Sequence, residues 1–257
     1  MGILELTSHI PELLSMKVYP PILYKIGNEE LLKKRKVSIV GSRNPLNYTK
    51  NATFELAHKL SQCGVCIVSG GAMGVDALAH KGASASNTIM VAGTGLDKRY
   101  PHINHKLIEE IETYGLVLSQ FKVGSPSNKW NFPIRNEVIV ALGEALIVVQ
   151  ADINSGTMRS VEFAQKMGKP IFALPHRSGE SEGSNALLER GIAQPIYNID
   201  AFVSQFGEIK IDNSDNFLKY CNTKPLYNDA IALYGDTVYE YEFLGKIIIE
   251  NGHIKRV

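Results

Sequence analysis

Short apolar runs recur along the chain and are separated by longer segments of mixed character. Six of these runs are rich in β-branched residues: 37–40, 65–68, 88–91, 116–118, 145–149 and 170–174. Within them apolar residues follow one another without alternation, which is typical of strands buried on both faces of a sheet. The pattern therefore predicts six buried strands.

Segments with helical spacing fill the gaps between these runs. They cover residues 48–62, 75–83, 105–113, 133–142 and 157–167. Gly64, Gly115 and Gly168 follow at positions where a helix C-terminal cap belongs. This alternation predicts an α/β fold with a doubly wound, mainly parallel sheet over residues 36–206. Ligands bind such sheets at the loops that follow the carboxyl ends of the strands.

Both ends of the chain depart from this alternation. Residues 1–35 are less regular and are interpreted as a lead-in, and the basic run 33–36 as a solvated surface rather than a nucleic-acid contact. Residues 207–216 are polar, as in a linker. Residues 217–257 predict a small separate helical unit that ends in a β-hairpin, with Asn251-Gly252 as its turn.

Composition limits the classes of protein that fit this chain. Of its 257 residues 44% are hydrophobic and 21% charged, and the net charge is +1. A nucleic-acid partner would therefore have to meet a local basic patch, because the chain as a whole is nearly neutral. No run has the length of a membrane span and the first residues lack a secretory pattern, so we expect a cytoplasmic protein without membrane contact.

Cysteine and histidine usage indicates neither a disulfide framework nor a metal site. There are three cysteines, and an odd, low number argues against paired thiols. Cys63 and Cys66 have redox spacing, but a helix end and a buried strand explain them as packing residues. His102 and His105 are close in sequence, yet no cysteine or carboxylate cluster joins them, so we expect no metal.

Three glycine–serine loops carry the candidate chemistry. They are Gly41-Ser42-Arg43, Ser69-Gly70-Gly71 and Ser155-Gly156-Thr157, and each precedes a predicted helix. Small residues let a backbone approach a ligand closely, and a helix N-terminus offers unpaired N–H groups that bind anions, above all phosphate. Plain N-capping would also explain the hydroxyl groups. Three such loops in one sheet suggest a row of phosphates.

The usual partners of phosphate loops are missing from them. The dinucleotide fingerprint G-x-G-x-x-G, the P-loop G-x-x-x-x-G-K-[ST] and the nucleophile elbow G-x-S-x-G are not found there. We therefore expect no small-molecule cofactor and no catalytic residue.

Six sequence blocks, in the family's own order, resemble the DprA/Smf family of DNA-processing proteins. The blocks are 41–48 (GSRNPLNY), 69–76 (SGGAMGVD), 93–104 (GTGLDKRYPHIN), 132–136 (FPIRN), 155–157 (SGT) and 183–191 (GSNALLERG). The resemblance covers residues 17–206. It implies an extended Rossmann DNA-binding domain, a homodimer, and a single-stranded DNA-binding protein that protects incoming strands in natural transformation and loads the RecA recombinase onto them. The tail from residue 217 weakly resembles a winged-helix-like unit of the family.

The resemblance also implies a role for several residues near the predicted helix 133–142. Lys129 resembles a DNA-contacting lysine, and Phe132 matches a position implicated in base stacking. Arg135 and Asn136 belong to the block F-P-x-R-N. At Glu137 the chain departs from the family, which often has a second arginine there, so that Glu137 could hold Arg135 in an ion pair instead.

Simpler interpretations of these residues stay open at the level of sequence. Arg43 could clamp a phosphate, or it could brace its loop through an acidic residue such as Asp76. Phe132 could stack on a base or pack in the core, and for Trp130 a core position is favoured.

The alternative function is that of a nucleoside-monophosphate phosphoribohydrolase of the LOG type on a related fold. Such an enzyme has a loop P-G-G-x-G-T-x-x-E, whose glutamate would correspond to Ser160 in this chain. Glu162 is two residues further on, on another face of the predicted helix, so the position of the general acid–base is vacant.

Overall fold

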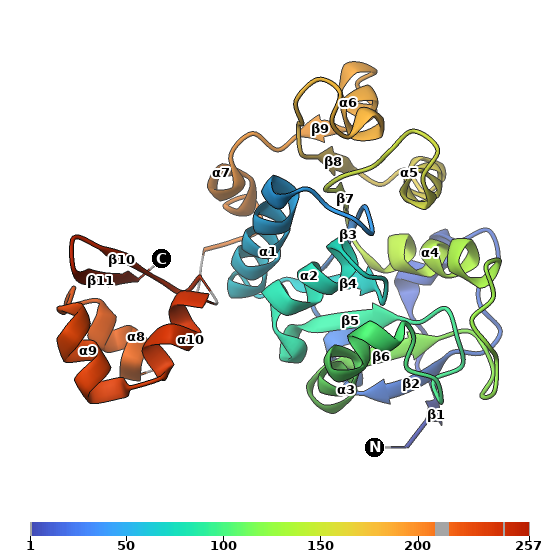
Figure 1. Ribbon diagram of the computed structural model, residues 1–257. Coiled ribbons are helices and arrows are strands. Elements are labelled where there is room, and N and C mark those ends of the chain that lie inside the picture. The colour runs from blue at the N-terminus through green and yellow to red at the C-terminus, as the bar shows by residue number, and fades with distance from the viewer. Residues whose placement is uncertain (1, 209–215, 244, 257) are drawn as a thin grey trace. The chain divides into compact units, whose positions relative to one another are not determined.

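The structure is a computed structural model that describes residues 2–208, 216–243 and 245–256 (Figure 1). The chain divides into two compact units, Met1–Ile209 and Lys210–Val257. Residues 209–215 of the predicted linker 207–216 lie outside the described residues.

A nine-stranded sheet forms the centre of the first unit, and Figure 1 shows it running from β1 to β9. Its order is β1-β2-β6-β5-β4-β3-β7-β8-β9. The strands are β1 (Leu4–Glu5), β2 (Tyr24–Gly27), β3 (Lys36–Val40), β4 (Cys66–Gly70), β5 (Thr88–Val91), β6 (Leu116–Ser119), β7 (Leu146–Val148), β8 (Ile171–Ala173) and β9 (Gln194–Pro195). From β6 to β9 neighbouring strands are parallel, whereas β1 and β2 are antiparallel additions. The predicted doubly wound α/β fold is confirmed.

Helices cover both faces of this sheet. They are α1 (Asn47–Gln62), α2 (Val75–Ala83), α3 (His105–Tyr114), α4 (Asn131–Leu142), α5 (Gly156–Lys166), α6 (Glu182–Glu189) and α7 (Ile199–Val203). One apolar layer joins α1, α2 and α7 to the sheet and a second joins α3, while α4, α5 and α6 pack into a cluster on the other side. Each of the five predicted helices is present, with ends shifted by no more than two residues.

The order of strands reverses at β3, and this reversal sets the position of the site. From β3 the chain moves to β4, β5 and β6 on one side, whereas β7, β8 and β9 extend the sheet on the other. The chain therefore leaves the carboxyl ends of β3 and β7 in opposite directions along the sheet. In open α/β sheets this divergence opens a crevice that ligands use.

The first 35 residues are more ordered than the sequence predicted. They supply β1, β2 and two short 3-10 helices, η1 (Pro11–Ser15) and η2 (Glu29–Lys33). Ile10, Leu13, Leu23 and Leu31 of this segment are buried in the core of the first unit. The pattern missed β2 because its pairing with β6, rather than a continuous apolar run, makes it a strand.

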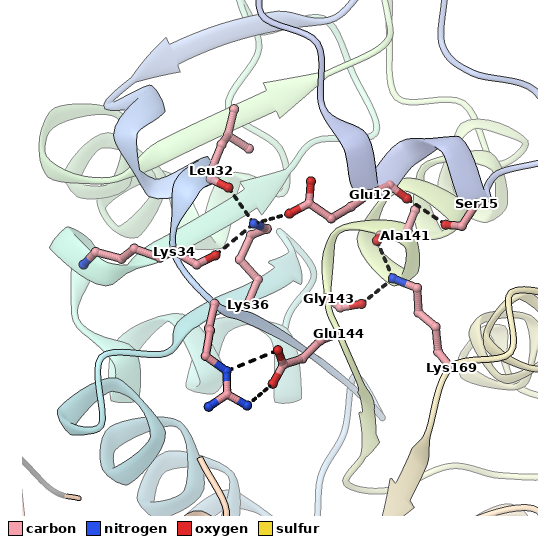
Figure 2. A network of polar contacts seen from close by, with 10 residues as sticks. Glu12, Ser15, Leu32, Lys34, Lys36, Ala141, Gly143, Glu144 and Lys169 are labelled. Atoms are coloured by element: carbon pink, nitrogen blue, oxygen red, sulfur yellow. Dashed lines mark hydrogen bonds and ion pairs between the residues drawn. The ribbon is translucent and has the colours of Figure 1, made fainter. Parts of the chain in front are cut away.

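The interpretation of the basic run 33–36 as a solvated surface agrees with the exposure of residues 33–35 but is wrong for Lys36. Lys36 is only 4% exposed, its ammonium lies 2.6 Å from Glu12 Oε1, and it donates hydrogen bonds to Leu32 O and Lys34 O. Arg35 forms an ion pair with Glu144. Figure 2 shows the Lys36 ammonium group among Glu12, Leu32 and Lys34. Lys36 therefore holds the N-terminal segment against β3.

A neighbouring lysine completes this network from the other side. Lys169 donates hydrogen bonds to Ala141 O and Gly143 O, two carbonyl groups at the C-terminal end of α4 (Figure 2). Its burial lowers the pKa of the Lys169 amine to about 8. Because the last carbonyl groups of a helix have no partner within the helix, Lys169 satisfies part of α4 that would otherwise be unpaired.

The second unit has its own small core. It consists of α8 (Asn216–Cys221), α9 (Tyr227–Tyr234), α10 (Thr237–Phe243) and a hairpin of β10 (Ile247–Glu250) and β11 (His253–Arg256). Phe217, Ala230, Val238, Ile247 and Ile254 are buried together. Asn251 and Gly252 have φ values of 51° and 76°, so the predicted Asn-Gly hairpin turn is confirmed.

No helix among the described residues combines the length and the apolar character that crossing a membrane requires.

Candidate nucleic-acid interface

A cavity of about 690 Å³ opens at the carboxyl ends of β3 and β7. Three segments far apart in sequence supply most of its wall: the loop after β3, the first turns of α4, and the start of α5. The lining residues that the sequence predicted as a site are Gly41, Ser42, Arg43, Lys129, Phe132, Arg135, Asn136, Ser155, Gly156 and Thr157. The fold therefore brings the first and third glycine–serine loops together with α4.

The first loop presents Arg43 to the cavity. Gly41 has no room for a side chain, because a Cβ there would lie 2.7 Å from Val75 Cγ2. Ser42 accepts hydrogen bonds from Asn44 N at its hydroxyl and from Val75 N at its carbonyl, which fixes the loop against α2. Arg43 is exposed and forms no ion pair in the described part of the chain, so its guanidinium is available to an anion. It lies 5.9 Å from the Phe132 ring centroid.

The second loop contributes differently from what the sequence predicted. Ser69 is fully buried and donates its hydroxyl to Ile39 O at 2.6 Å. Gly70 lies beneath the cavity floor, where its carbonyl accepts a hydrogen bond from His80 Nε2 at 2.7 Å. Gly71 lines only a small adjoining recess of about 60 Å³. The expectation that Ser69 and Gly70 face a ligand is therefore corrected, and Ala72 is the residue of this loop that reaches the main cavity.

The third loop places two buried hydroxyl groups on the cavity wall without a partner. Ser155 precedes α5 but makes no capping hydrogen bond, and its Oγ is buried and unpaired. Ser160, one turn into α5, is 0% exposed and its Oγ is also unpaired. Leaving a buried polar atom without a hydrogen bond costs about 1–3 kcal/mol. Neither of these hydroxyl groups makes a hydrogen bond within the described part of the chain, and plain capping does not explain Ser155.

Ser160 is the site residue that the sequence analysis missed. It was considered only as the position where a catalytic glutamate is absent. The signal was its place one turn after Gly156 and Thr157, which brings it back to the side of the helix that holds these two residues.

Phe132 is both a packed residue and a wall of the cavity. Its ring blocks any side chain at Gly93, where a Cβ would lie 2.8 Å from Phe132 Cδ1, and it contacts the Tyr100 ring with 5.8 Å between centroids. The side chain is nevertheless only partly buried. Trp130 is 67% exposed, so the expectation that it is a core residue is wrong.

Arg135 projects from α4 into the cavity floor. It is 4% exposed, donates from Nη1 to Val91 O, and leaves its Nε without a partner. The predicted alternative, an ion pair with Glu137, does not form, because Glu137 points away and accepts a hydrogen bond from Lys17 N at 3.1 Å. Arg135 therefore keeps a free donor beside the cavity.

Asp76 is the acidic counterpart of Arg135 at the cavity floor. It is 8% exposed, and burial raises the pKa of its carboxyl group, while the charge of Arg135 and the Ala72 N–H act in the opposite direction. Burial likewise lowers the pKa of Arg135, which Asp76 partly offsets. Arg135 and Asp76 thus lie together at the cavity floor, both buried, and each offsets part of the effect of burial on the pKa of the other.

The alternative function finds no carboxylate where it needs one. Ser160 stands in the position of the catalytic glutamate, and Glu162 is exposed and paired with Arg159 at 3.3 Å. The carboxylates on the cavity wall are Asp76 and Asp152. Among the described residues, no group of three or more histidine, cysteine or acidic side chains is arranged to hold a metal ion.

The fold and this site define a doubly wound α/β protein with a crevice at its topological switch point that is lined by arginine, lysine and hydroxyl side chains. The family model described as DNA recombination-mediator protein A matches residues 3–207, and the chain belongs to this family.

Relatives of the chain carry the names DprA and Smf. Protein Smf of Synechocystis is 35% identical over 200 residues, which is 75% of this chain and 50% of that protein. The DNA processing protein DprA of Bacillus subtilis is 31% identical over 203 residues, covering 77% of this chain and 68% of that one. The chain thus spans half to about two thirds of the length of these curated relatives.

A solved structure of the DNA processing protein A of Helicobacter pylori, studied for its single-stranded DNA binding mode, is also similar. It is 42% identical, covers 79% of this chain and 94% of that one, and superposes with a TM-score of 0.77.

Proposed function

We propose that this chain binds single-stranded DNA, with the cavity holding successive phosphates of one strand. The observation that carries the proposal is the convergence of unsatisfied donors on one wall. Two buried hydroxyl groups, of Ser155 and Ser160, and the guanidinium Nε of Arg135 have no partner. Exposed Arg43 and Lys129 line the same cavity.

The chemistry of these groups suits a phosphodiester. Guanidinium groups bind phosphate oxygens with paired, charge-assisted hydrogen bonds, and serine hydroxyls and helix N–H groups add neutral donors. Phe132, partly buried on the same wall, offers a ring on which a base can stack. Since phosphates carry no sequence information, little preference among DNA sequences is expected.

The relatives support the same assignment at a coarser level. The Helicobacter pylori protein is described by its single-stranded DNA binding, and the Bacillus subtilis and Streptococcus pneumoniae relatives are DNA processing proteins. We extend the proposal to the role that the family resemblance implies. In this role a cytoplasmic homodimer protects incoming strands in natural transformation and loads RecA onto them, without itself being an enzyme.

The test is a binding titration with oligo-dT of increasing length against duplex DNA of the same length. If about four phosphates are neutralised, the logarithm of the binding constant should fall with the logarithm of salt concentration with a slope near −3. Arg43→Ala should make this slope shallower by about 0.7. The matched control is Lys166→Ala, which removes an exposed cation from the opposite end of α5.

Two outcomes would contradict the proposal. One is equal affinity for duplex and single strand, and the other is an Arg43→Ala variant whose affinity and salt slope match those of the wild type. Incubation with AMP addresses the alternative, because release of adenine at an enzymatic rate would establish a hydrolase.

A further inference from the structure

Trp130 is an exposed aromatic ring at the edge of the cavity. It is 67% exposed, and its neighbours Lys129 and Phe132 line the cavity wall. A large aromatic side chain left in water forgoes the free energy of burying its surface. The exposed ring is therefore available to a partner that covers it.

The backbone around Trp130 is held in place. Trp130 N donates to Asn128 Oδ1 at 3.1 Å, and Asn131 N donates to Asn128 O at 2.9 Å. The side chain of Asn131 donates to Gly93 O at 3.1 Å, which ties the start of α4 to the loop after β5. The ring is thus presented from an ordered turn, so little backbone entropy is lost when a ligand covers it.

Trp130 and Phe132 cannot serve the same base. Trp130 immediately precedes α4 and Phe132 is its second residue, so the two side chains leave the helix axis about 200° apart. Phe132 turns inward toward Gly93 and Tyr100, as its contacts show. A base that covers Trp130 must therefore belong to a nucleotide outside the cavity.

The Lys129 ammonium group beside the ring favours a nucleotide over an apolar protein partner. Lys129 Nζ lies 5.0 Å from the Trp130 ring centroid and is exposed. Proteins bind single-stranded nucleic acid with cations that contact the phosphates and aromatic rings on which the bases stack. Lys129 and Trp130 provide one group of each kind. An apolar protein partner would instead have to bury the ammonium group.

We propose that Trp130 and Lys129 form an outer nucleotide subsite, on which the strand continues after it leaves the cavity. Trp130 stacks on the base and Lys129 meets the adjoining phosphate. This inference rests on the proposed function, because the strand must first occupy the cavity. It adds to that function the direction in which the strand leaves, over the N-terminal end of α4.

Intrinsic fluorescence tests the subsite directly, because Trp130 is the single tryptophan of the chain. Oligo-dT should quench its emission in a saturable titration. dTMP, which reaches only the cavity, should leave the emission unchanged. Quenching should begin at an oligonucleotide length greater than the shortest one that binds.

Substitutions provide the second readout. A stacked base contributes about 1–3 kcal/mol, so Trp130→Ala should weaken oligo-dT binding by about 5- to 150-fold, using 1.4 kcal/mol per tenfold. The salt slope should remain that of the wild type, and Trp130→Tyr should restore most of the affinity. Lys129→Ala should instead make the slope shallower by about 0.7. Tyr114→Ala is the matched control, since Tyr114 is 63% exposed at the end of α3, before the amino end of β6.

The outcomes separate this inference from the function on which it rests. In one outcome, oligo-dT binds in a manner that depends on Arg43, yet leaves the Trp130 emission unchanged and binds Trp130→Ala as tightly as the wild type. This outcome would overturn the outer subsite alone. No binding of oligo-dT by the wild type would overturn both. Weakening by Tyr114→Ala equal to that by Trp130→Ala would also refute it, because the effect would then not be specific to this ring.

Discussion

Acid should weaken the fold through one buried histidine beneath the cavity. His80 is 0% exposed, its Nε2 lies 2.7 Å from Gly70 O and its Nδ1 lies 2.7 Å from Thr88 Oγ1. The Gly70 carbonyl can only accept, so the neutral ring donates from Nε2. The Thr88 hydroxyl has one proton, which Nδ1 shares with Ile67 O, 2.8 Å from the same hydroxyl. Burial, with a further contribution from the charge of Arg135, lowers the pKa of His80 to about 4.

The size of the effect follows from the difference between the folded and unfolded pKa. Between about pH 4 and 6.5 the unfolded chain binds a proton at this histidine that the folded chain does not, so stability rises with pH across this window. Acidification from pH 7 to pH 5 should therefore cost about 2 kcal/mol. For a unit of this size that corresponds to a fall in Tm of about 4–8 °C.

Thermal unfolding of the wild type and of His80→Gln at pH 7 and pH 5 measures this term. The variant lacks the titrating ring, so its Tm should fall by about 4–8 °C less than that of the wild type. Asp76 acts in the opposite direction, because a raised carboxyl pKa stabilises the folded state on acidification, but it is present in both proteins. Equal losses of Tm in the two proteins would refute the assignment to His80.

Three further predictions concern the cavity and its support. Gly70→Ala should lower stability by about 2 kcal/mol or more and weaken DNA binding, because its Cβ would lie 2.5 Å from Asp76 Oδ2 and 2.6 Å from Arg135 Cζ. Gly2→Ala, whose Cβ would meet nothing within 4 Å and which lies outside the cavity, is the control, and equal effects in urea denaturation and DNA titration would contradict the steric argument. Ser160→Ala should leave the free energy of unfolding unchanged or raise it, since its Oγ has no partner, yet weaken oligo-dT binding by about 10- to 100-fold; unaltered DNA affinity would remove Ser160 from the site. Glu12→Gln should destabilise the fold by about 2–3 kcal/mol by leaving Lys36 buried without its carboxylate, and Glu12→Gln with Lys36→Met should regain most of that loss in urea denaturation; additive losses would argue against the pairing.

The sequence predicted the parts of the fold that local patterns determine. Six strands, five helices and the Asn251-Gly252 turn follow from apolar periodicity and turn chemistry, and the structure contains them. The strands β1, β2 and β9 were missed because each is short and is stabilised by its neighbour in the sheet rather than by its own composition. Lys36 was misjudged for a similar reason, since its partner Glu12 is 24 residues away and only folding brings them together.

The site shows the same division between local and long-range information. The motifs located Arg43, Phe132 and the Ser155 loop, and these do line one cavity. A motif does not reveal depth, so Ser69 and Gly70 were placed at the surface although the chain buries them. Ser160 and the exposure of Trp130 depend on how helices pack, which the order of residues alone does not show.

The position of Arg43 over Phe132 has a consequence for how binding energy is distributed. The Arg43 guanidinium carbon lies 5.9 Å from the Phe132 ring centroid, and that of Arg135 lies 6.0 Å from it. A base cannot lie on a face of the ring that a guanidinium covers, so stacking there requires the cation on that face to move away. Stacking and phosphate capture would then be thermodynamically coupled, and the free energies lost in single substitutions of Arg43 and Phe132 would not add to that of the double variant.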